Sequence, residues 1–236
     1  MISGEIEDII FYNAQTGYTI LNIKTSAGVV TATGKFPPLG VGEQVELEGE
    51  FKINPKYGNQ FNATSVSVKK PASISAIKNY LASGLISGVG EVTATNIVNT
   101  FGERTLEVIE FFPTELAKVK GISIKKAGDI ALAYKEIKKM QEAVMFLQQY
   151  DISINMAVKI YNKYKGATQN ILNENPYILI EDVAGIGFKT ADKIAFKMGI
   201  TNKSPARLMA GLVYFLNQVV QEVKLCRNLR TADNSH

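Results

Sequence analysis

The sequence has one cysteine, Cys226, and one histidine, His236. A lone cysteine excludes an intramolecular disulfide framework, and a Cys/His zinc cluster or a histidine-based catalytic site needs more of these side chains than the chain has. Acidic residues are plentiful, but they form no spaced cluster with a base or a metal ligand, so we expect them on solvated faces. Most familiar hydrolase chemistry is thereby excluded, and no metal site is expected.

Long apolar runs are absent as well. No stretch approaches the roughly 18 apolar residues that would span a bilayer, and the start, MISGEIEDII, lacks a basic region followed by an apolar core. These absences predict a soluble, cytoplasmic protein with no membrane partner.

A surplus of positive charge is missing from the first part of the chain. Residues 1–70 carry 6 Lys and 7 Asp or Glu, whereas residues 71–236 carry 20 Lys or Arg and 15 Asp or Glu. The whole positive excess therefore lies in the second part. A solvated lysine-rich surface is the commonest explanation of such an excess, but it also suits a polyanionic partner.

Residues 2–68 alternate between apolar and polar with a period of two. In the segment EQVELEGEF, we expect Val45, Leu47, Gly49 and Phe51 on the buried face and the intervening glutamates on the other. Five short strands predict a small OB-like β-barrel, with an SH3-like barrel as the alternative. Turn signals place these strands at about 2–12, 17–26, 28–36, 43–53 and 60–69.

After residues 69–73, interpreted as a short linker, the periodicity becomes helical and one pattern occurs four times: GVGEVTATNI, GISIKKAGDI, DISINMAVKI and GIGFKTADKI. Each copy has alanine at the seventh place and isoleucine at the tenth. The copies start at Gly88, Gly121, Asp151 and Gly185, at offsets of 33, 30 and 34 residues. We therefore expect a multidomain α+β chain, with the barrel at 1–70, two hairpin pairs at 71–140 and 141–203, and a C-terminal apolar helix and divergent tail at 204–236.

The glycine pairs in these copies do not fit a nucleotide-binding loop. A dinucleotide-binding loop needs a preceding strand and a third glycine three residues on, which no copy has. A P-loop needs Gly-Lys-Ser/Thr in direct succession, and in GIGFKT residue Phe188 lies between Gly187 and Lys189. No site for a nucleoside triphosphate is visible, so this chain is not predicted to be an enzyme.

The remaining interpretation is a turn between two helices. Paired glycines allow positive φ angles and a close approach of two backbones. The first amides of the second helix have no intrahelical partner, and they point outward at the positive end of the helix dipole. A phosphate fits such a site, and because phosphates carry no base identity, binding is expected to be independent of sequence and sensitive to salt.

The strings ISGVG…A, VKGIS…A and VAGIG…A resemble the helix-hairpin-helix motif, an apolar-Gly-apolar-Gly pattern followed by alanine. The third copy departs from it, because Asp151 and Ser153 replace both glycines and a carboxylate would repel phosphate, so we expect it to be structural. Hairpins that only pack helices or bind protein are the alternative for the other three. The resemblance implies DNA-binding residues at Gly88, Gly90, Thr93, Gly121, Ser123, Lys125, Lys126, Gly185, Gly187, Lys189 and Thr190.

The order of segments over about residues 2–222 resembles the N-terminal region of the RecD-like ATP-dependent DNA helicases. The resemblance rests on FYNAQTGYTILNIKT, NPKYGNQFNA, YLASGLISGVG, FLQQYDISINMAVKIYNKYK and NPYILIEDVAGIGFKTADKIA. It implies a role in DNA repair or recombination beside a 5′-to-3′ motor, with single-stranded or forked DNA as the partner. ATP and Mg are implied only for that motor, and no cofactor is expected on this chain. The tail KLCRNLRTADNSH does not fit the family pattern, so the chain is interpreted as a shortened homologue or the product of a shifted reading frame.

Two other surfaces are candidates for contacts. In the barrel, Tyr18, Tyr57 and Phe61, with Tyr12, are candidates for stacking on single-stranded bases, although such aromatics are more often core and docking of a replication or repair protein is the competing role. Residues 205–225 form an apolar helix, with Ser204 as N-cap, that suggests a face for another domain or for self-association. A junction-binding protein is a narrower alternative, since RuvA also joins an OB barrel to two hairpins.

Overall fold

The computed structural model describes the backbone of residues 1–14 and 16–233 and the side chains of residues 1–14 and 16–220. The side chains of Cys226, His236 and the rest of the divergent tail lie outside the described residues. The chain forms two compact units, Met1–Gly166 and Ala167–His236. Within the described part of the chain, no helix is both long and apolar enough to cross a membrane.

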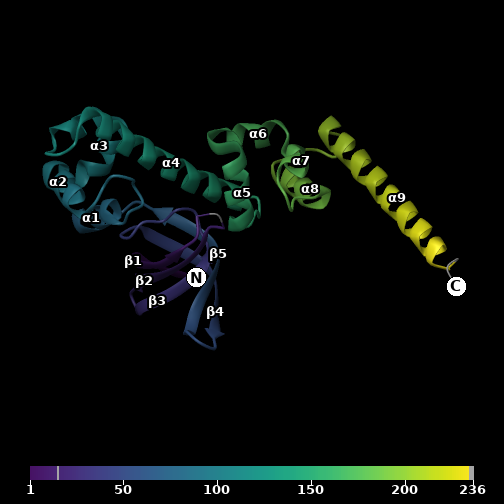
Figure 1. Cartoon of the computed structure of the whole chain (residues 1–236), viewed down its shortest axis with the longest axis horizontal. Helices are drawn as coiled ribbons and strands as arrows, with labels where there is room; N and C mark the ends of the chain where they lie inside the picture. The colour runs from purple at the N-terminus through teal and green to yellow at the C-terminus, as the bar shows by residue number, and fades with distance from the viewer. Residues whose placement is uncertain (15, 234–236) are drawn as a thin grey trace. The chain divides into compact units, whose positions relative to one another are not determined.

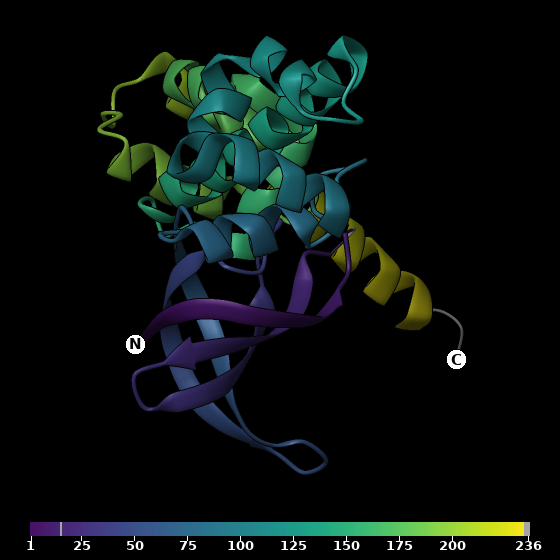
Figure 2. The same cartoon turned by 90° about the vertical axis from the view of Figure 1, so that its left-hand side faces the viewer.

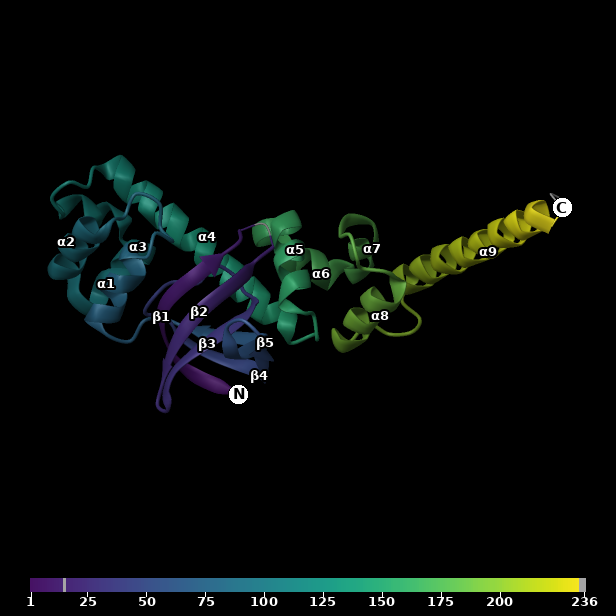
Figure 3. The same ribbon diagram turned by 60° about the horizontal axis from the view of Figure 1, so that its bottom comes forward.

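Five strands form the barrel of the first unit (Figure 1): β1 (Ile2–Tyr12), β2 (Tyr18–Thr25), β3 (Gly28–Lys35), β4 (Gln44–Asn54) and β5 (Gly58–Lys69). The barrel closes in the order β1-β2-β3-β5-β4, and β3 with β5 is its parallel pair (Figure 3). Ile6, Leu21, Ile23 and Leu47 are fully buried inside it. The predicted OB-like barrel is confirmed, and each strand end lies within two residues of its expected position.

The expected buried face of β4 is correct only as far as Leu47. Val45 and Leu47 are buried, but the pairing of β4 with β5 shifts register between Glu48 and Gly49, and Phe51 is 53% exposed. A Cβ on Gly49 would lie 2.1 Å from the carbonyl oxygen of Asn62, so only glycine fits this close approach. The extra residue of this irregularity is Thr64 of β5, so the alternation of β4 itself continues. Residues 48–53 are nevertheless exposed on both faces of β4, and the prediction that Phe51 is buried is wrong.

The helices of the first unit follow the barrel. They are α1 (Ile74–Ala82), α2 (Glu91–Phe101), α3 (Thr105–Phe111), α4 (Ile124–Gln148) and α5 (Ile154–Tyr164), with the 3-10 turns η1 (Gly102–Arg104) and η2 (Pro113–Lys118). One apolar cluster, including Leu81, Ile97, Ile109 and Ile130, lies between α1 and the first half of α4. Helix α4 continues through residue 140 without a break. The domain boundaries expected after 70, 140 and 203 stay a prediction.

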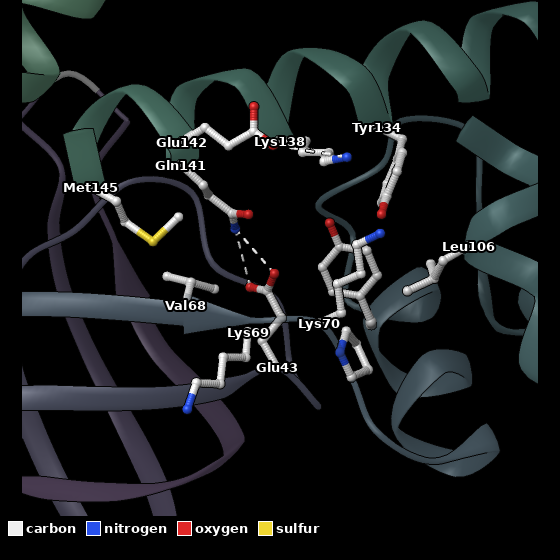
Figure 4. A pocket seen from close by; sticks show the side chains of 12 residues that line it. Glu43, Val68, Lys69, Lys70, Leu106, Tyr134, Lys138, Gln141, Glu142 and Met145 are labelled. Atoms are coloured by element: carbon white, nitrogen blue, oxygen red, sulfur yellow. Dashed lines mark hydrogen bonds and ion pairs between the residues drawn. The ribbon is translucent and has the colours of Figure 1, made fainter. Parts of the chain in front are cut away.

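A buried carboxylate joins the barrel to α4 (Figure 4). Glu43 is 3% exposed, and its carboxylate accepts hydrogen bonds from the Gly40 N–H at 2.8 Å and from Gln141 Nε2 at 3.1 Å. Two helical turns further along α4, the Gln148 side-chain amide forms hydrogen bonds with both the N–H and the carbonyl of Val66, each at 3.0 Å. Burial raises the pKa of Glu43 to about 7, although its two hydrogen bonds act in the opposite direction. These contacts fix the barrel against α4.

The second unit contains α6 (Thr168–Glu174), η4 (Pro176–Ile178), α7 (Leu179–Asp182), α8 (Phe188–Lys197) and α9 (Pro205–Asp233), and the 3-10 turn η3 (Lys165–Ala167) leads into it. Its buried core includes Leu172, Leu179, Ile194 and Ala195. Helix α9 begins at Pro205, as predicted, and the Leu208 N–H donates to the carbonyl of Ser204 at 3.1 Å.

Candidate nucleic-acid interface

The four sequence repeats share one backbone geometry. The first residue of each copy has a positive φ angle: 80° at Gly88, 86° at Gly121, 58° at Asp151 and 96° at Gly185. The third residue is in each case the N-cap of a helix, namely Gly90 for α2, Ser123 for α4, Ser153 for α5 and Gly187 for α8. We name these turns hairpin one (residues 86–93), hairpin two (119–126), hairpin three (149–156) and hairpin four (183–190).

The repeated alanines and isoleucines hold each hairpin closed. The alanines are at most 1% exposed and the isoleucines at most 2% exposed. A methyl group at the seventh place lets the second helix approach closely, and the isoleucine one turn later fills the interior behind it. These residues are Ala94, Ala127, Ala157 and Ala191, with Ile97, Ile130, Ile160 and Ile194.

Hairpins one, two and four share a short hydrogen-bonded turn that hairpin three lacks. In hairpin one the Val89 N–H donates to the Ile86 carbonyl at 3.2 Å, and the equivalent bonds in hairpins two and four measure 3.1 Å. In hairpin three the Ile152 N–H instead reaches back to the carbonyl of Leu147 at 3.4 Å. The three copies that begin with glycine therefore share one turn. Hairpin three also begins with a left-handed residue, Asp151, but its turn has a different hydrogen bond.

Side-chain capping differs among the helix N-termini. The N-caps Gly90 and Gly187 have no side chain with which to cap their helices. The Ser123 hydroxyl, in contrast, accepts a hydrogen bond from the Lys126 N–H at 3.2 Å. Hairpin two consequently presents one amide fewer to a phosphate than an uncapped helix would, whereas hairpins one and four leave that position to a ligand or to water.

Lys126 brings hairpins one and two together. A Cβ built on Gly88 would lie 4.0 Å from Lys126 Cε, so the lysine stem lies beside the loop of hairpin one. Lys125 is exposed and Lys126 is half-buried. Hairpin one carries an exposed carboxylate, Glu91, in the first turn of its own helix. Besides this carboxylate, the loop of hairpin one therefore has a lysine stem from hairpin two beside it.

Hairpin four carries exposed Lys189 and Thr190 at the start of α8. The nearby carboxylate of Asp192 is neutralised, because Arg207 binds it through two hydrogen bonds of 2.8 and 3.0 Å and the Tyr177 hydroxyl donates to it at 2.7 Å. The Arg207 contact lowers the pKa of Asp192 below its usual range. The carboxylate closest to Lys189 on α8 is thus already paired within the second unit.

Hairpin three has a different chemical character. Its left-handed residue is Asp151, which is exposed, and the side chain of Ile154 at the first helical position is buried. At the equivalent position hairpin two has Ile124, which is 74% exposed. The side chain that opens the helix is therefore used for packing in hairpin three and faces solvent in hairpin two.

The cavity beside Glu43 is a structural feature. It measures about 120 Å³, and Tyr80 and Tyr134 line it with their rings edge to face, 6.3 Å apart (Figure 4). Among the described residues, each buried side-chain nitrogen or oxygen has a hydrogen-bond partner, and no three His, Cys, Asp or Glu side chains come together as metal ligands.

The barrel aromatics proposed for base stacking fall into two classes. Tyr18 is 39% exposed and Tyr57 is 64% exposed, so each ring is accessible. Phe61 is 2% exposed and packs edge to face against Phe51, with ring centroids 5.1 Å apart, so it cannot stack on a base. The expectation for Phe61 is corrected, and Phe51 is the exposed ring of that pair. Sequence reasoning missed it because β4 is exposed on both faces from Glu48 to Ile53, beyond the buried part of the strand.

Comparisons with known proteins agree with this architecture. A family model described as the OB-fold domain of the ATP-dependent DNA helicase YrrC matches residues 1–71, which supports the OB fold over the SH3-like alternative. A model of a SAM-like helix-hairpin-helix tandem matches residues 80–136, and one of the helix-hairpin-helix domain of the ATP-dependent RecD2 DNA helicase matches residues 136–222.

A curated relative shows the same similarity along the chain. The ATP-dependent RecD2 DNA helicase of Deinococcus radiodurans is 27% identical over 223 residues, which cover 91% of this chain and 31% of the relative. The chain thus spans about a third of the length of the relative that it matches. With the three domain models in the same order as the barrel and the hairpins, the chain corresponds to the N-terminal OB-fold and helix-hairpin-helix region of the RecD-like DNA helicases.

Proposed function

We propose that this chain binds DNA without sequence preference, through the backbone amides and lysines of hairpins one, two and four. The observation that carries the proposal is the shared turn: three hairpins place a left-handed glycine and a helix N-terminus at the surface, two of them with lysines in the first turn of the helix. Amides at such a terminus attract phosphate, and the lysines add charge-assisted contacts.

The ligand groups would come from the residues that the motif assigns. Gly88, Gly90 and Thr93 serve hairpin one, and Lys126 reaches the same loop from hairpin two. In hairpins two and four the groups are those of Gly121, Ser123, Lys125, Gly185, Gly187, Lys189 and Thr190. None of these groups reads a base edge, so affinity depends on phosphate spacing and on salt.

The relative's name and the domain models support a wider proposal. In a full-length protein, this region would act beside a 5′-to-3′ ATP-dependent helicase motor in the cytoplasm, in DNA repair or recombination, with single-stranded or forked DNA as the substrate. ATP and Mg would be bound by that motor, with no catalytic group supplied by this chain.

A second proposal concerns contacts with protein. In the described part of α9, eight large apolar side chains are each at least 40% exposed, and between Leu208 and Val220 the helix has no charged residue. An apolar groove of about 700 Å³ runs between the start of α8 and α9 and includes Met209 and Val213. These features support self-association or docking of a replication or repair protein through residues 205–225, of which residues 221–225 lie outside the described side chains.

The DNA-binding proposal is tested by fluorescence anisotropy of labelled single-stranded and forked DNA over a salt series. The test variant is Lys125→Ala/Lys126→Ala/Lys189→Ala. A matched control, Lys24→Ala/Lys159→Ala/Lys203→Ala, removes the same charge from exposed positions outside the phosphate-binding turns.

The wild-type affinity should fall with salt, and for each phosphate contact that the test variant loses, the slope of log K against log salt should become shallower by about 0.7 on a single strand. The control should keep the wild-type slope. Equal slopes for the test and control variants, or no binding by the wild type at low salt, would overturn the proposal.

A further inference from the structure

A two-stranded ribbon extends from the barrel beyond the bulge at Gly49. It consists of residues 50–60, the end of β4, the turn and the start of β5, and it projects away from the helices of the first unit (Figure 2). Phe51 pairs with Phe61 and Ile53 with Asn59 across the ribbon. The Asn54 side chain holds the turn, because its Oδ1 accepts from the N–H groups of Lys56 and Tyr57 at 2.9 and 3.1 Å.

One face of this ribbon is apolar and uncovered. Phe51 and Ile53 are two residues apart on a strand, so their side chains point to the same face. They are 53% and 84% exposed, and Tyr57 at the turn is 64% exposed. Ile53 has the largest exposed fraction of any large apolar side chain in the described residues. Exposure of this kind on a small barrel marks a contact surface.

The charge around the ribbon favours a polyanion. The ribbon carries two lysines, Lys52 and Lys56, and one acidic residue, Glu50. Glu50, at the base of the ribbon, is paired with Lys52 at 2.9 Å. The Lys56 ammonium lies 5.0 Å from the centre of the Tyr57 ring, so an exposed cation accompanies the exposed ring. The slight negative charge of the whole barrel therefore does not describe its projecting end.

We propose that the ribbon contacts unpaired bases of a DNA strand, with Phe51, Ile53 and Tyr57 against the bases and Lys52 and Lys56 near the phosphates. Aromatic rings stack on bases of any identity, and single-strand sites combine such rings with basic side chains. A duplex hides the faces of its bases, so this contact selects single-stranded or opened DNA. The inference rests on the proposed DNA-binding function and adds the part of the DNA that the barrel touches.

The test compares two labelled oligonucleotides of equal length: an ordinary single strand and a strand of abasic sites, which keeps the phosphates and lacks the bases. The full chain is used, with the variant Ile53→Ser/Tyr57→Ser. Both side chains are solvent-exposed, so the barrel should keep its fold, which circular dichroism and the melting temperature verify. The control, Val29→Ser, removes an apolar side chain that is 56% exposed elsewhere on the barrel.

The wild type and Val29→Ser should bind the ordinary strand about tenfold more tightly than the abasic strand. Ile53→Ser/Tyr57→Ser should lose most of this preference while binding the abasic strand as the wild type does. Equal binding of both strands by the wild type, or an unchanged preference in the ribbon variant, overturns the inference and leaves the phosphate contacts of the hairpins intact. A wild type that binds neither strand overturns the DNA-binding proposal and this inference together.

Discussion

Hairpin three and the other three hairpins have the same internal scaffold but different surfaces. All four have a left-handed first residue, an N-cap at the third and a buried Ala and Ile behind the turn. Hairpin three replaces glycine with the exposed carboxylate of Asp151 and buries Ile154. We infer that packing of the hairpin and the proposed recognition of phosphate depend on different residues, so each can be changed without the other.

The shared scaffold should respond alike in all four hairpins. Replacing any one of the buried alanines with leucine, as in Ala157→Leu or Ala191→Leu, forces extra methyl groups between two helices and should cost about 3 kcal/mol of unfolding free energy. Urea unfolding followed by circular dichroism measures the loss. A hairpin that tolerates leucine without loss would break the comparison, because its alanine would not serve the common packing.

A substitution of Glu43 should alter the pH dependence of stability without altering DNA binding. The folded pKa of about 7 lies above the ordinary value of 4.5, so the folded state binds the proton more tightly than the unfolded state. The associated stability is fully present below pH 4.5 and is lost as pH rises through 7, a change of about 3 kcal/mol.

Glu43→Gln, which resembles the protonated acid, should remove most of this pH dependence. Urea unfolding at several pH values measures it, and the salt slope of DNA binding should stay unchanged. A wild-type stability that rises between pH 4.5 and 7 in parallel with that of the variant would contradict the assignment to Glu43.

Substitution of Lys126 tests the proposed DNA-binding surface of hairpins one and two. Because it lies beside the loop of hairpin one as well as in hairpin two, Lys126→Ala should weaken DNA binding about fivefold near 0.1 M salt, the value of one phosphate contact. Lys159→Ala, on the helix of hairpin three, should change binding little. Titration by anisotropy measures both, and equal effects would remove the distinction between the hairpins.

The smallest effect is expected at Asp151. Asp151→Asn removes the carboxylate and keeps a residue type that tolerates a positive φ angle, so the fold should be unchanged and DNA affinity should rise about twofold or less. The same titration measures the rise. A large increase would mean that hairpin three already lies against the DNA backbone.

Local patterns predicted most of the fold. The period-two alternation gave the five strands, and the repeated Ala and Ile positions gave the four hairpins, because both depend on residues close in sequence. These features need no knowledge of which distant segments meet.

The sequence could not predict contacts between distant segments. Phe51 and Phe61 are direct partners across β4 and β5, yet Phe51 is exposed and Phe61 is buried, because distant segments of the barrel cover only one of the two rings. Likewise, the approach of Lys126 to Gly88 depends on how two hairpins pack, and the buried position of Glu43 depends on where α4 lies against the barrel. Each of these residues had an ordinary appearance in the sequence.

The most direct test of the central claim is the change in backbone amide chemical shifts when the isotope-labelled chain is titrated with single-stranded DNA. The second helical residue reports on each hairpin: Val92 in one, Lys125 in two, Asn155 in three and Lys189 in four. The account predicts saturable shifts at Val92, Lys125 and Lys189 and little change at Asn155. Equal shifts at Asn155, or no shift at the other three amides while DNA binds, would contradict it.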